Sequence, residues 1–403
     1  MELFRLEHKK LWRKAGVRVS VALCFVYIVI FGNILSLQWF VNGSSHGAAN
    51  MLQRNFDGYS MIRAKQEYAR GFGGELTDES LRRMVRDYQR MTADGAEDEM
   101  EKTDVYTVNS WLGKLWPELR DAHSYQTMMS YVDPEKLTGF YERRQQLIET
   151  SLESNGYTDE EKEYLLQMEQ KVKKPFRYEW ADGWLQLLSS MVSDLGLVMA
   201  LFLAISLSGM FAGEWHDNAG PLVLTTKNGW EKLAHAKILV GVSFALELFT
   251  MLAVGGIASQ LFFFGTSGWD MPVQTIRFDA VAPMNMLQAE IYEYVFALLG
   301  AVGFAGVVML LSAAMKSHVT ALLLSLAVVY GPMAIDKYLP YAVRRVLDFI
   351  PLAGNGTEIF RTNTFHLFGN IVWSPYLLVS IPVLIGILCM PAAVKRWSRR
   401  GKA

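Results

Sequence analysis

Cysteine is almost absent from this sequence: its 403 residues include only Cys24 and Cys389. Both lie inside apolar runs, and no Cys-x-x-Cys pair occurs. Small secreted domains that depend on disulfide bonds carry several regularly spaced cysteines. The sequence therefore excludes a fold built on a disulfide framework.

Catalytic signatures are also missing. The sequence contains no His-Glu-x-x-His and no phosphate-binding Gly-x-x-x-x-Gly-Lys-Ser/Thr, the motifs of metalloproteases and P-loop ATPases. His216 and His235 are not spaced to share a helix face. We predict no catalytic residue, no metal site and no cofactor in this chain, which is not itself an enzyme. Any ATP that it depends on is hydrolysed by another polypeptide.

Net charge is small (−1), whereas 51% of the residues are hydrophobic and gather in long runs. An apolar helix of about 20 residues spans the hydrocarbon core of a bilayer. We therefore predict an all-α membrane protein with six transmembrane helices. These are expected at residues 19–41, 187–212, 238–264, 291–315, 318–339 and 372–394.

Basic residues cluster at both ends of the chain, within 1–18 and 395–402. Because cytoplasmic segments of membrane proteins are enriched in Lys and Arg, both termini are predicted to be cytoplasmic. Two termini on one side require an even number of spans, in agreement with six. The protein is expected to be a multi-pass protein of the cell membrane.

Residues 1–16 are predicted to form an amphipathic helix at the cytoplasmic interface, before a first span at 17–42. Leu3, Leu11 and Trp12 fall on one side at helical spacing, and most basic residues take the other. Alternatively, the basic residues only anchor the first span.

The polar segment 43–183 lies between the first two spans and is therefore predicted to be a large extracellular domain. Thr77, Asp133-Pro134 and Thr158 each begin a stretch that resembles a capped helix, so the domain is expected to be helical. Its acidic residues either attract cationic substrates or belong to ordinary solvated helices.

Residues 184–403 are predicted to hold spans two to six. They include a cytoplasmic loop at 213–237 and an outer, re-entrant-type loop at 340–371, which Pro340 and Pro351 interrupt. A glycine stripe in the fourth span allows close helix packing, within one subunit or at a dimer seam. Its members are Gly300, Gly303 and Gly306.

Four acids lie in or near the apolar runs, where a charge must face a cavity or a partner. Asp194, Glu290 and Glu293 are expected at outer ends of spans, whereas Glu247 is deep in the third span. Glu247 and Asp194 are candidates for a translocation path or an interhelical contact. A coupling-ion site at Glu247 is the other hypothesis.

The loop between the second and third spans contains Glu214, Gly220, the run Leu222-Val223-Leu224-Thr225-Thr226, Lys232 and Ala236-Lys237. In these residues it resembles the first cytoplasmic loop of ABC exporter permeases of the ABC type 2 family, which have the type V exporter fold. The arginine usual after the leucine-threonine run is absent, and Gly229-Trp230-Glu231 occupies that region.

Further features agree with the resemblance: the basic N-terminal helix with Glu7 and Lys10, the number of spans, and the interrupted outer loop. The long extracellular segment looks like those of Gram-positive permeases that export antimicrobial peptides or antibiotics. The resemblance thus implies a bacterial plasma-membrane exporter. Its substrate would be a hydrophobic or amphipathic peptide, an antibiotic or a lipid-like molecule.

The resemblance also implies partners: separate ABC ATPase subunits that bind ATP and Mg²⁺, a second permease subunit, identical or related, and the lipid bilayer, with no nucleic acid. The loop at 214–236 would form a coupling helix seated on the ATPase. Its candidate residues are Glu214, Gly220, Leu222, Leu224, Trp230 and Lys232. Those of the interfacial helix are Glu7, Lys10 and Trp12.

Two other classes of function remain open from the sequence. One is a membrane sensor or anchor whose extracellular helices bind a ligand or partner without transport. The other is an ion-coupled secondary transporter, which would need inverted repeats and paired intramembrane charges.

Overall fold

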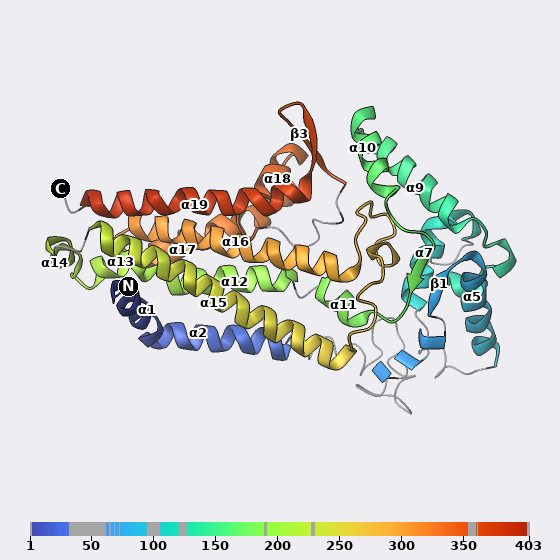
Figure 1. Cartoon of the computed structure of the whole chain (residues 1–403), viewed down its shortest axis with the longest axis horizontal. Coiled ribbons are helices and arrows are strands. Elements are labelled where there is room, and N and C mark those ends of the chain that lie inside the picture. Colours follow the sequence, from blue (N-terminus) through green and yellow to red (C-terminus); the bar gives the residue numbers. More distant parts are fainter. Residues whose placement is uncertain are drawn as a thin grey trace.

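The computed structural model describes residues 2–31, 62–63, 66–67, 69–71, 73–94, 105–120, 127–188, 192–226, 230–353, 360 and 362–400. Long helices run side by side in a bundle, and a smaller, mostly helical domain lies at one end of it (Figure 1). The N-terminal helix and the end of the last helix lie at the opposite end. These are called the domain end and the termini end below.

Five helical segments of the described chain are long and apolar enough to cross a membrane. They are α12 with α13 (Val192–Leu207 and Gly209–His216), α15 (Glu231–Phe264), α16 (Met286–Ala314), α17 (His318–Ile335) and α19 (Ser374–Arg400). The chain is thus a predominantly helical membrane protein. The first predicted span is described only through α2 (Ala15–Val26) and a π-helical turn (Tyr27–Phe31). The rest of that span, up to residue 42, lies outside the described residues.

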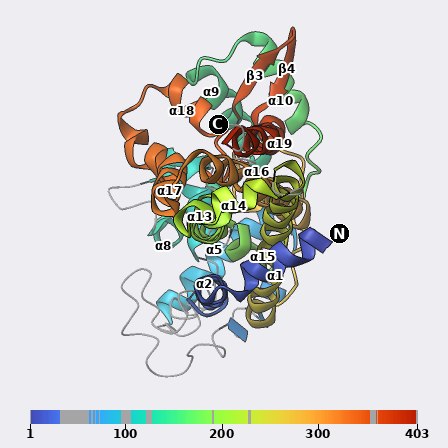
Figure 2. The ribbon, with the colours of Figure 1, turned by 90° about the vertical axis from the view of Figure 1, so that its left-hand side faces the viewer.

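Helix α16 is the centre of the bundle, in contact with α12, α13, α15, α17 and α19 (Figure 2). A Cβ added at Gly303 or Gly306 would overlap the backbone of α19, at Pro382 and Gly386. Gly300 faces a leucine of the connection between α17 and α19. The glycine stripe therefore lets two helices of the same chain pack closely.

The second span is divided at Ser208, between α12 and α13. The hydroxyl of Ser312, on α16, accepts hydrogen bonds from the amides of Phe211 (2.9 Å) and Ala212 (3.1 Å). It donates to the carbonyl oxygen of Ser208 at 2.6 Å. A side chain that inserts into a helical hydrogen-bond ladder interrupts it, so this contact explains the break.

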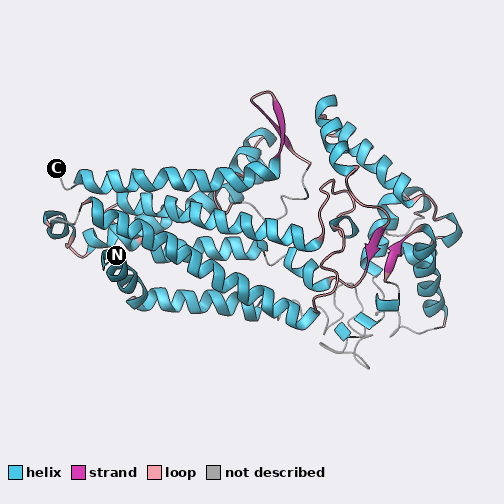
Figure 3. Ribbon diagram, in the orientation of Figure 1, coloured by secondary structure: helices cyan, strands magenta, loops and turns pink. Residues whose placement is uncertain are grey.

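The domain contains helices and one short strand pair, which Figure 3 shows in magenta. Its helices are α5 (Asp78–Ala93), α7 (Val105–Leu115), α8 (Met128–Tyr131), α9 (Phe140–Ser154) and α10 (Asp159–Glu169). Strands β1 (Gly74–Leu76) and β2 (Phe176–Tyr178) pair antiparallel. The strand pair joins segments from near the beginning and the end of the domain. The sequence predicted only helices in this segment, so these strands were missed.

Two predicted helix starts are confirmed. Thr77 caps α5 and Thr158 caps α10, each in a capping box with the residue three positions on. The third is wrong. Asp133 caps only a 3-10 turn, Pro134–Lys136, and α9 begins later, at Phe140.

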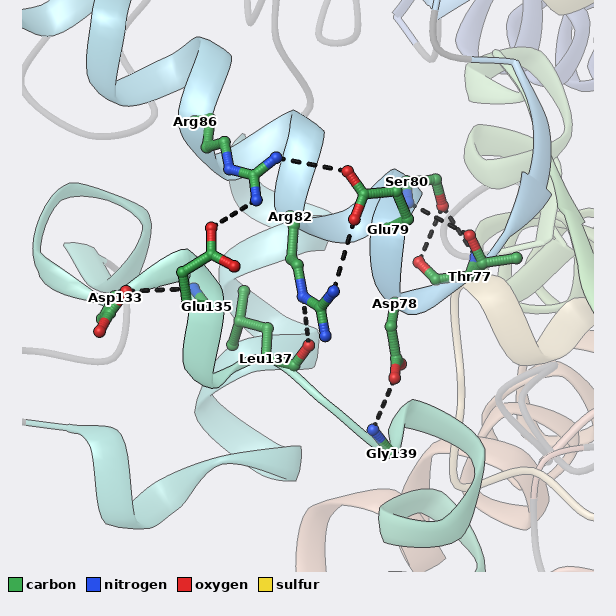
Figure 4. A network of polar contacts seen from close by, with 10 residues as sticks. All are labelled: Thr77, Asp78, Glu79, Ser80, Arg82, Arg86, Asp133, Glu135, Leu137 and Gly139. Carbon is green, nitrogen blue, oxygen red and sulfur yellow. Dashed lines mark hydrogen bonds and ion pairs between the residues drawn. The ribbon is translucent and has the colours of Figure 1, made fainter.

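The late start of α9 has a tertiary cause, visible in Figure 4. Gly139 precedes the helix with a left-handed backbone (φ 73°). The carboxylate of Asp78, on α5, accepts hydrogen bonds from the amides of Gly139 (2.8 Å) and Phe140 (3.0 Å). The cap of α9 is thus supplied by a residue distant in the sequence, which no local pattern indicates.

A buried arginine fastens the domain to the connection between α15 and α16. Arg144, on α9, is fully buried and forms an ion pair with Glu169. Its guanidinium also donates to the carbonyl oxygens of Phe278 (2.6 Å) and Ala280 (2.9 Å). A buried guanidinium needs such partners, so these bonds fix the domain to the bundle.

The outer loop predicted at 340–371 contains one short helix, α18 (Tyr341–Leu347), and a β-hairpin, β3 (Thr364–Leu367) with β4 (Asn370–Trp373). Residues 354–359 and 361 lie outside the described part of the chain. The prediction missed the hairpin, which contacts α10 of the domain. Thr364 donates to the Glu161 carboxylate at 2.6 Å.

We expect Arg144→Met to lower the free energy of unfolding by about 3 kcal/mol, because the buried Glu169 then keeps only the partly exposed Lys174 and the Phe278 carbonyl loses its donor. Denaturant unfolding of the full chain in detergent, followed by tryptophan fluorescence, measures it. Arg86→Met is the control, because Arg86 is a half-exposed arginine of the same domain that bridges Glu79 and Glu135. Equal losses in both variants would contradict the role of Arg144.

The contact between α10 and the hairpin should depend on pH. Burial raises the pKa of Glu161, but the hydrogen bonds that it accepts outweigh burial and leave the pKa below its ordinary value. Ionised Glu161 therefore stabilises the contact between α10 and the hairpin above about pH 4.3, the ordinary glutamate pKa. This stabilisation is lost as the pH falls through the lowered value.

Double electron–electron resonance measures the distance between spin labels at Glu163 and Leu367, and its pH dependence tests this contact. The distance distribution should broaden in acid in the wild type and be broad at neutral pH in Glu161→Gln. A pH-independent wild-type distribution would refute the assignment.

Candidate functional site

The N-terminal helix α1 (Glu2–Arg13) packs against α15 at the termini end. Leu11 is buried, and the Trp12 indole lies edge-on to Phe244, 5.6 Å between ring centres. The apolar side identified in the sequence thus packs on another helix of the protein. The opposite side of α1 remains exposed, as its basic residues require.

A network of alternating charges joins α1, α13 and α15. Lys237 is only 1% exposed, and its ammonium donates to Glu7 (2.7 Å) and to Glu214 (2.8 Å). Lys10 donates to the same oxygen of Glu214 at 2.6 Å. Two lysines and two glutamates balance one another, so the buried charges are neutralised in pairs. This set is called the Lys237 network below.

The Lys237 network shifts the pKa values of Lys10 and Lys14, which lie outside the membrane spans. Burial lowers the pKa of Lys10, but the hydrogen bond and charge of Glu214 outweigh it, so the pKa lies above its ordinary value. Burial and the positive charges of Lys10 and Lys237 lower the pKa of Lys14. Lys10 therefore stays charged across the physiological pH range.

Glu247 forms a second contact between α1 and α15. Its carboxylate accepts hydrogen bonds from the Trp12 indole (3.0 Å) and the Ser243 hydroxyl (2.7 Å). The His8 ring nitrogen Nε2 lies 2.8 Å from it. Of the interpretations open for Glu247, the structure places it in an interhelical contact.

Aromatic rings support the loop that follows α13. Trp397, near the end of α19, is fully buried between Phe211 and Trp215, with ring centres 5.4 and 6.0 Å away. A Cβ added at Gly220 would lie 3.0 Å from the Trp215 ring. A larger residue at position 220 would therefore displace the indole, which explains the glycine.

Helix α14 (Gly220–Thr225) carries the loop away from the bundle (Figure 1). Leu222 is 72% exposed, and the side chain of Leu224 is outside the described set. Trp230 is half-buried against the core at the start of α15, and Lys232 is exposed. The predicted loop residues thus divide into a buried base, Glu214 and Gly220, and an exposed tip.

The remaining predicted residue, Asp194, lies in the first turn of α12, with its side chain outside the described set. Sequence reasoning named Lys237 only as part of the resemblance, not as a site residue, and it did not select His8 or Trp397. For Lys237 a signal was present: a lysine at the start of an apolar run needs an acid, and Glu7 and Glu214 lie at the same predicted end. Nothing local indicates the partners of Trp397.

No protein-family model, curated protein or solved structure matches this chain. Among the described residues, no group of three or more His, Cys, Asp or Glu side chains could hold a metal ion. The arrangement at the termini end consists of ion pairs that fix helices and an apolar tip that projects from them. Such a site can bind a protein and transmit force.

Lys237→Met should loosen the attachment of α1 to the bundle, because Glu7 loses its ion pair and Glu214 keeps only the half-exposed Lys10. We expect a loss of stability of about 3 kcal/mol and faster amide hydrogen exchange throughout α1. Lys10→Met is the matched control: Lys10 is half-exposed, and Glu214 keeps Lys237, so a loss of roughly 1 kcal/mol or less is expected. Unchanged exchange in Lys237→Met would show that α1 is held by its apolar face alone.

Proposed function

We propose that this chain is the permease subunit of an ATP-driven ABC exporter and that loop 213–237 couples it to a separate ATPase subunit. The observation that carries the proposal is the combination of an exposed apolar tip, Leu222 on α14, with a base fixed by buried contacts. A leucine that is 72% exposed on a short helix outside the apolar spans is suited to a protein partner. The resemblance of the loop to ABC type 2 permeases implies the partner class, an ABC ATPase.

The contacts at the base support a mechanical role. Glu214 lies near the end of the second span and belongs to the Lys237 network. On the other side of the loop, α15 begins directly after Trp230. Of the described residues, Glu214 therefore leads back into the second span, and Trp230 leads into the long helix α15. A displacement of α14 by a closing ATPase would move α13 and α15 as rigid elements. The Trp397 contact would carry the same displacement to α19.

The far ends of the same helices carry the second part of the proposal. The connection after α15 is fastened to the domain by Arg144, and the hairpin before α19 by Glu161. Movement of these helices would thus reach the domain, which we propose to be extracellular and to act on the exported molecule. The substrate class remains a hydrophobic or amphipathic peptide, antibiotic or lipid. ATP and Mg²⁺ bind the ATPase, and two permease subunits pair in the bilayer.

Leu222→Asp should abolish co-purification of the proposed ABC ATPase subunit and the associated stimulation of ATP hydrolysis. Burying an aspartate in the contact in place of leucine removes apolar contact and adds an unpaired charge. Ser317→Asp is the control, because Ser317 is exposed at the same end, in the turn before α17, and an aspartate can still cap that helix.

Loss of the ATPase only in Leu222→Asp supports the coupling role. If no ATPase co-purifies with the wild type, and ligands bind the domain without affecting hydrolysis, the chain is a sensor or anchor instead. If both variants keep the ATPase, the docking surface lies outside α14.

A further inference from the structure

Glu290 lies in the interior of the protein. It is in the second turn of α16 and only 3% exposed, although the sequence places it at the outer end of a span, where water would solvate it. The reason is tertiary: α16 is surrounded by the other spans. The carboxyl group is therefore separated from water by neighbouring helices.

Neither carboxylate oxygen of Glu290 has a hydrogen-bond partner among the described residues. The same is true of the buried hydroxyl of Tyr294. Residues four apart lie on the same face of a helix, and the charge of Glu290 acts on the Tyr294 phenol. Three oxygen atoms on one face of the central helix thus have no partner in the described chain.

A neighbouring helix offers a further oxygen. Gln260, on α15, is 1% exposed, and its side-chain carbonyl oxygen also lacks a partner in the described chain. Helix α15 ends at Phe264 and α16 begins at Met286, and the two helices pack together. Gln260 and Glu290 therefore lie about one turn inside the same end of the bundle.

Native proteins rarely leave buried polar oxygens without partners, and such groups point to an ion or water that binds there. An isolated buried carboxylate is strongly unfavourable unless a positive charge lies beside it. Lysines and arginines supply that charge to Glu214 and Glu169 in this chain. No ion pair with Glu290 occurs among the described residues, so its charge is balanced either by a bound cation or by a proton.

We propose that Glu290 and Tyr294, with Gln260 as a further ligand, bind a small monovalent cation, Na⁺, inside the bundle. Oxygen ligands suit hard cations. The Glu290 carboxylate balances one positive charge, so Na⁺ leaves these three ligands neutral, whereas Ca²⁺ or Mg²⁺ would leave a net positive charge on them. The deep burial of Glu290 excludes the body of an organic ammonium ion. The proposal does not depend on the exporter function, since it requires neither an ATPase nor a transported substrate.

The test is thermal unfolding of the full chain in nanodiscs, in NaCl or in N-methyl-D-glucamine chloride at equal ionic strength and pH. Because Na⁺ binds only the folded site, it should raise the Tm of the wild type by roughly 5 °C. This Na⁺-dependent increase in Tm should vanish in Glu290→Gln and become smaller in Tyr294→Phe. Glu160→Gln, an exposed acid of the domain, should keep the full rise.

Equilibrium binding of radioactive Na⁺ to the wild type and to Tyr294→Phe provides a second measurement that does not require Glu290→Gln to fold. Saturable binding of one ion per chain, weakened in Tyr294→Phe, supports the site. The proposal is overturned if Na⁺ has no effect on the wild type, or if Glu290→Gln shows the same rise. It is also overturned if the Tm responds to pH and not to Na⁺, which would mean that Glu290 binds only a proton.

Discussion

A lysine ammonium buried among apolar helices must be neutralised, and at the termini end this requirement determines the arrangement of the chain. Lys237 is almost fully enclosed and has Glu7 and Glu214 as its partners. These residues belong to three elements, and α1 lies more than 200 positions from the other two. The N-terminal helix is therefore part of the bundle, and the loop after α13 starts from a fixed point.

The same requirement acts at the domain end, through a different residue type. Arg144 is fully buried and has Glu169 and two backbone carbonyls as partners. Its planar guanidinium can reach several acceptors at once, which a lysine ammonium does with less defined geometry. Ion pairs thus fix both ends of the bundle. Between them, Gly303 and Gly306 let α16 and α19 pack by close backbone contact. Rigid ends joined by closely packed helices suit a protein that transmits movement.

Local patterns were enough to predict much of the fold. Five of the six predicted spans correspond to helices that could cross a membrane, because apolar length is a property of a contiguous segment. Thr77 and Thr158 begin helices as predicted, since a capping box involves residues only three apart. The start of α9 was predicted wrongly, because its cap, Asp78, comes from another helix. The β-hairpin before α19 was missed for a related reason: its environment includes α10 of the domain.

The sequence by itself determined that the chain is a helical membrane protein, where its apolar runs lie, and which loop resembles a coupling loop. It also identified Glu247 and the glycine stripe as unusual, because charges and small residues stand out in apolar segments, and Glu214 as part of the resemblance. Only the tertiary structure decided their partners: Lys237 for Glu214, His8 and Trp12 for Glu247, and α19 for the glycines. The physical reason is that burial and ion pairing depend on which helices pack together, and that packing joins residues more than 200 positions apart.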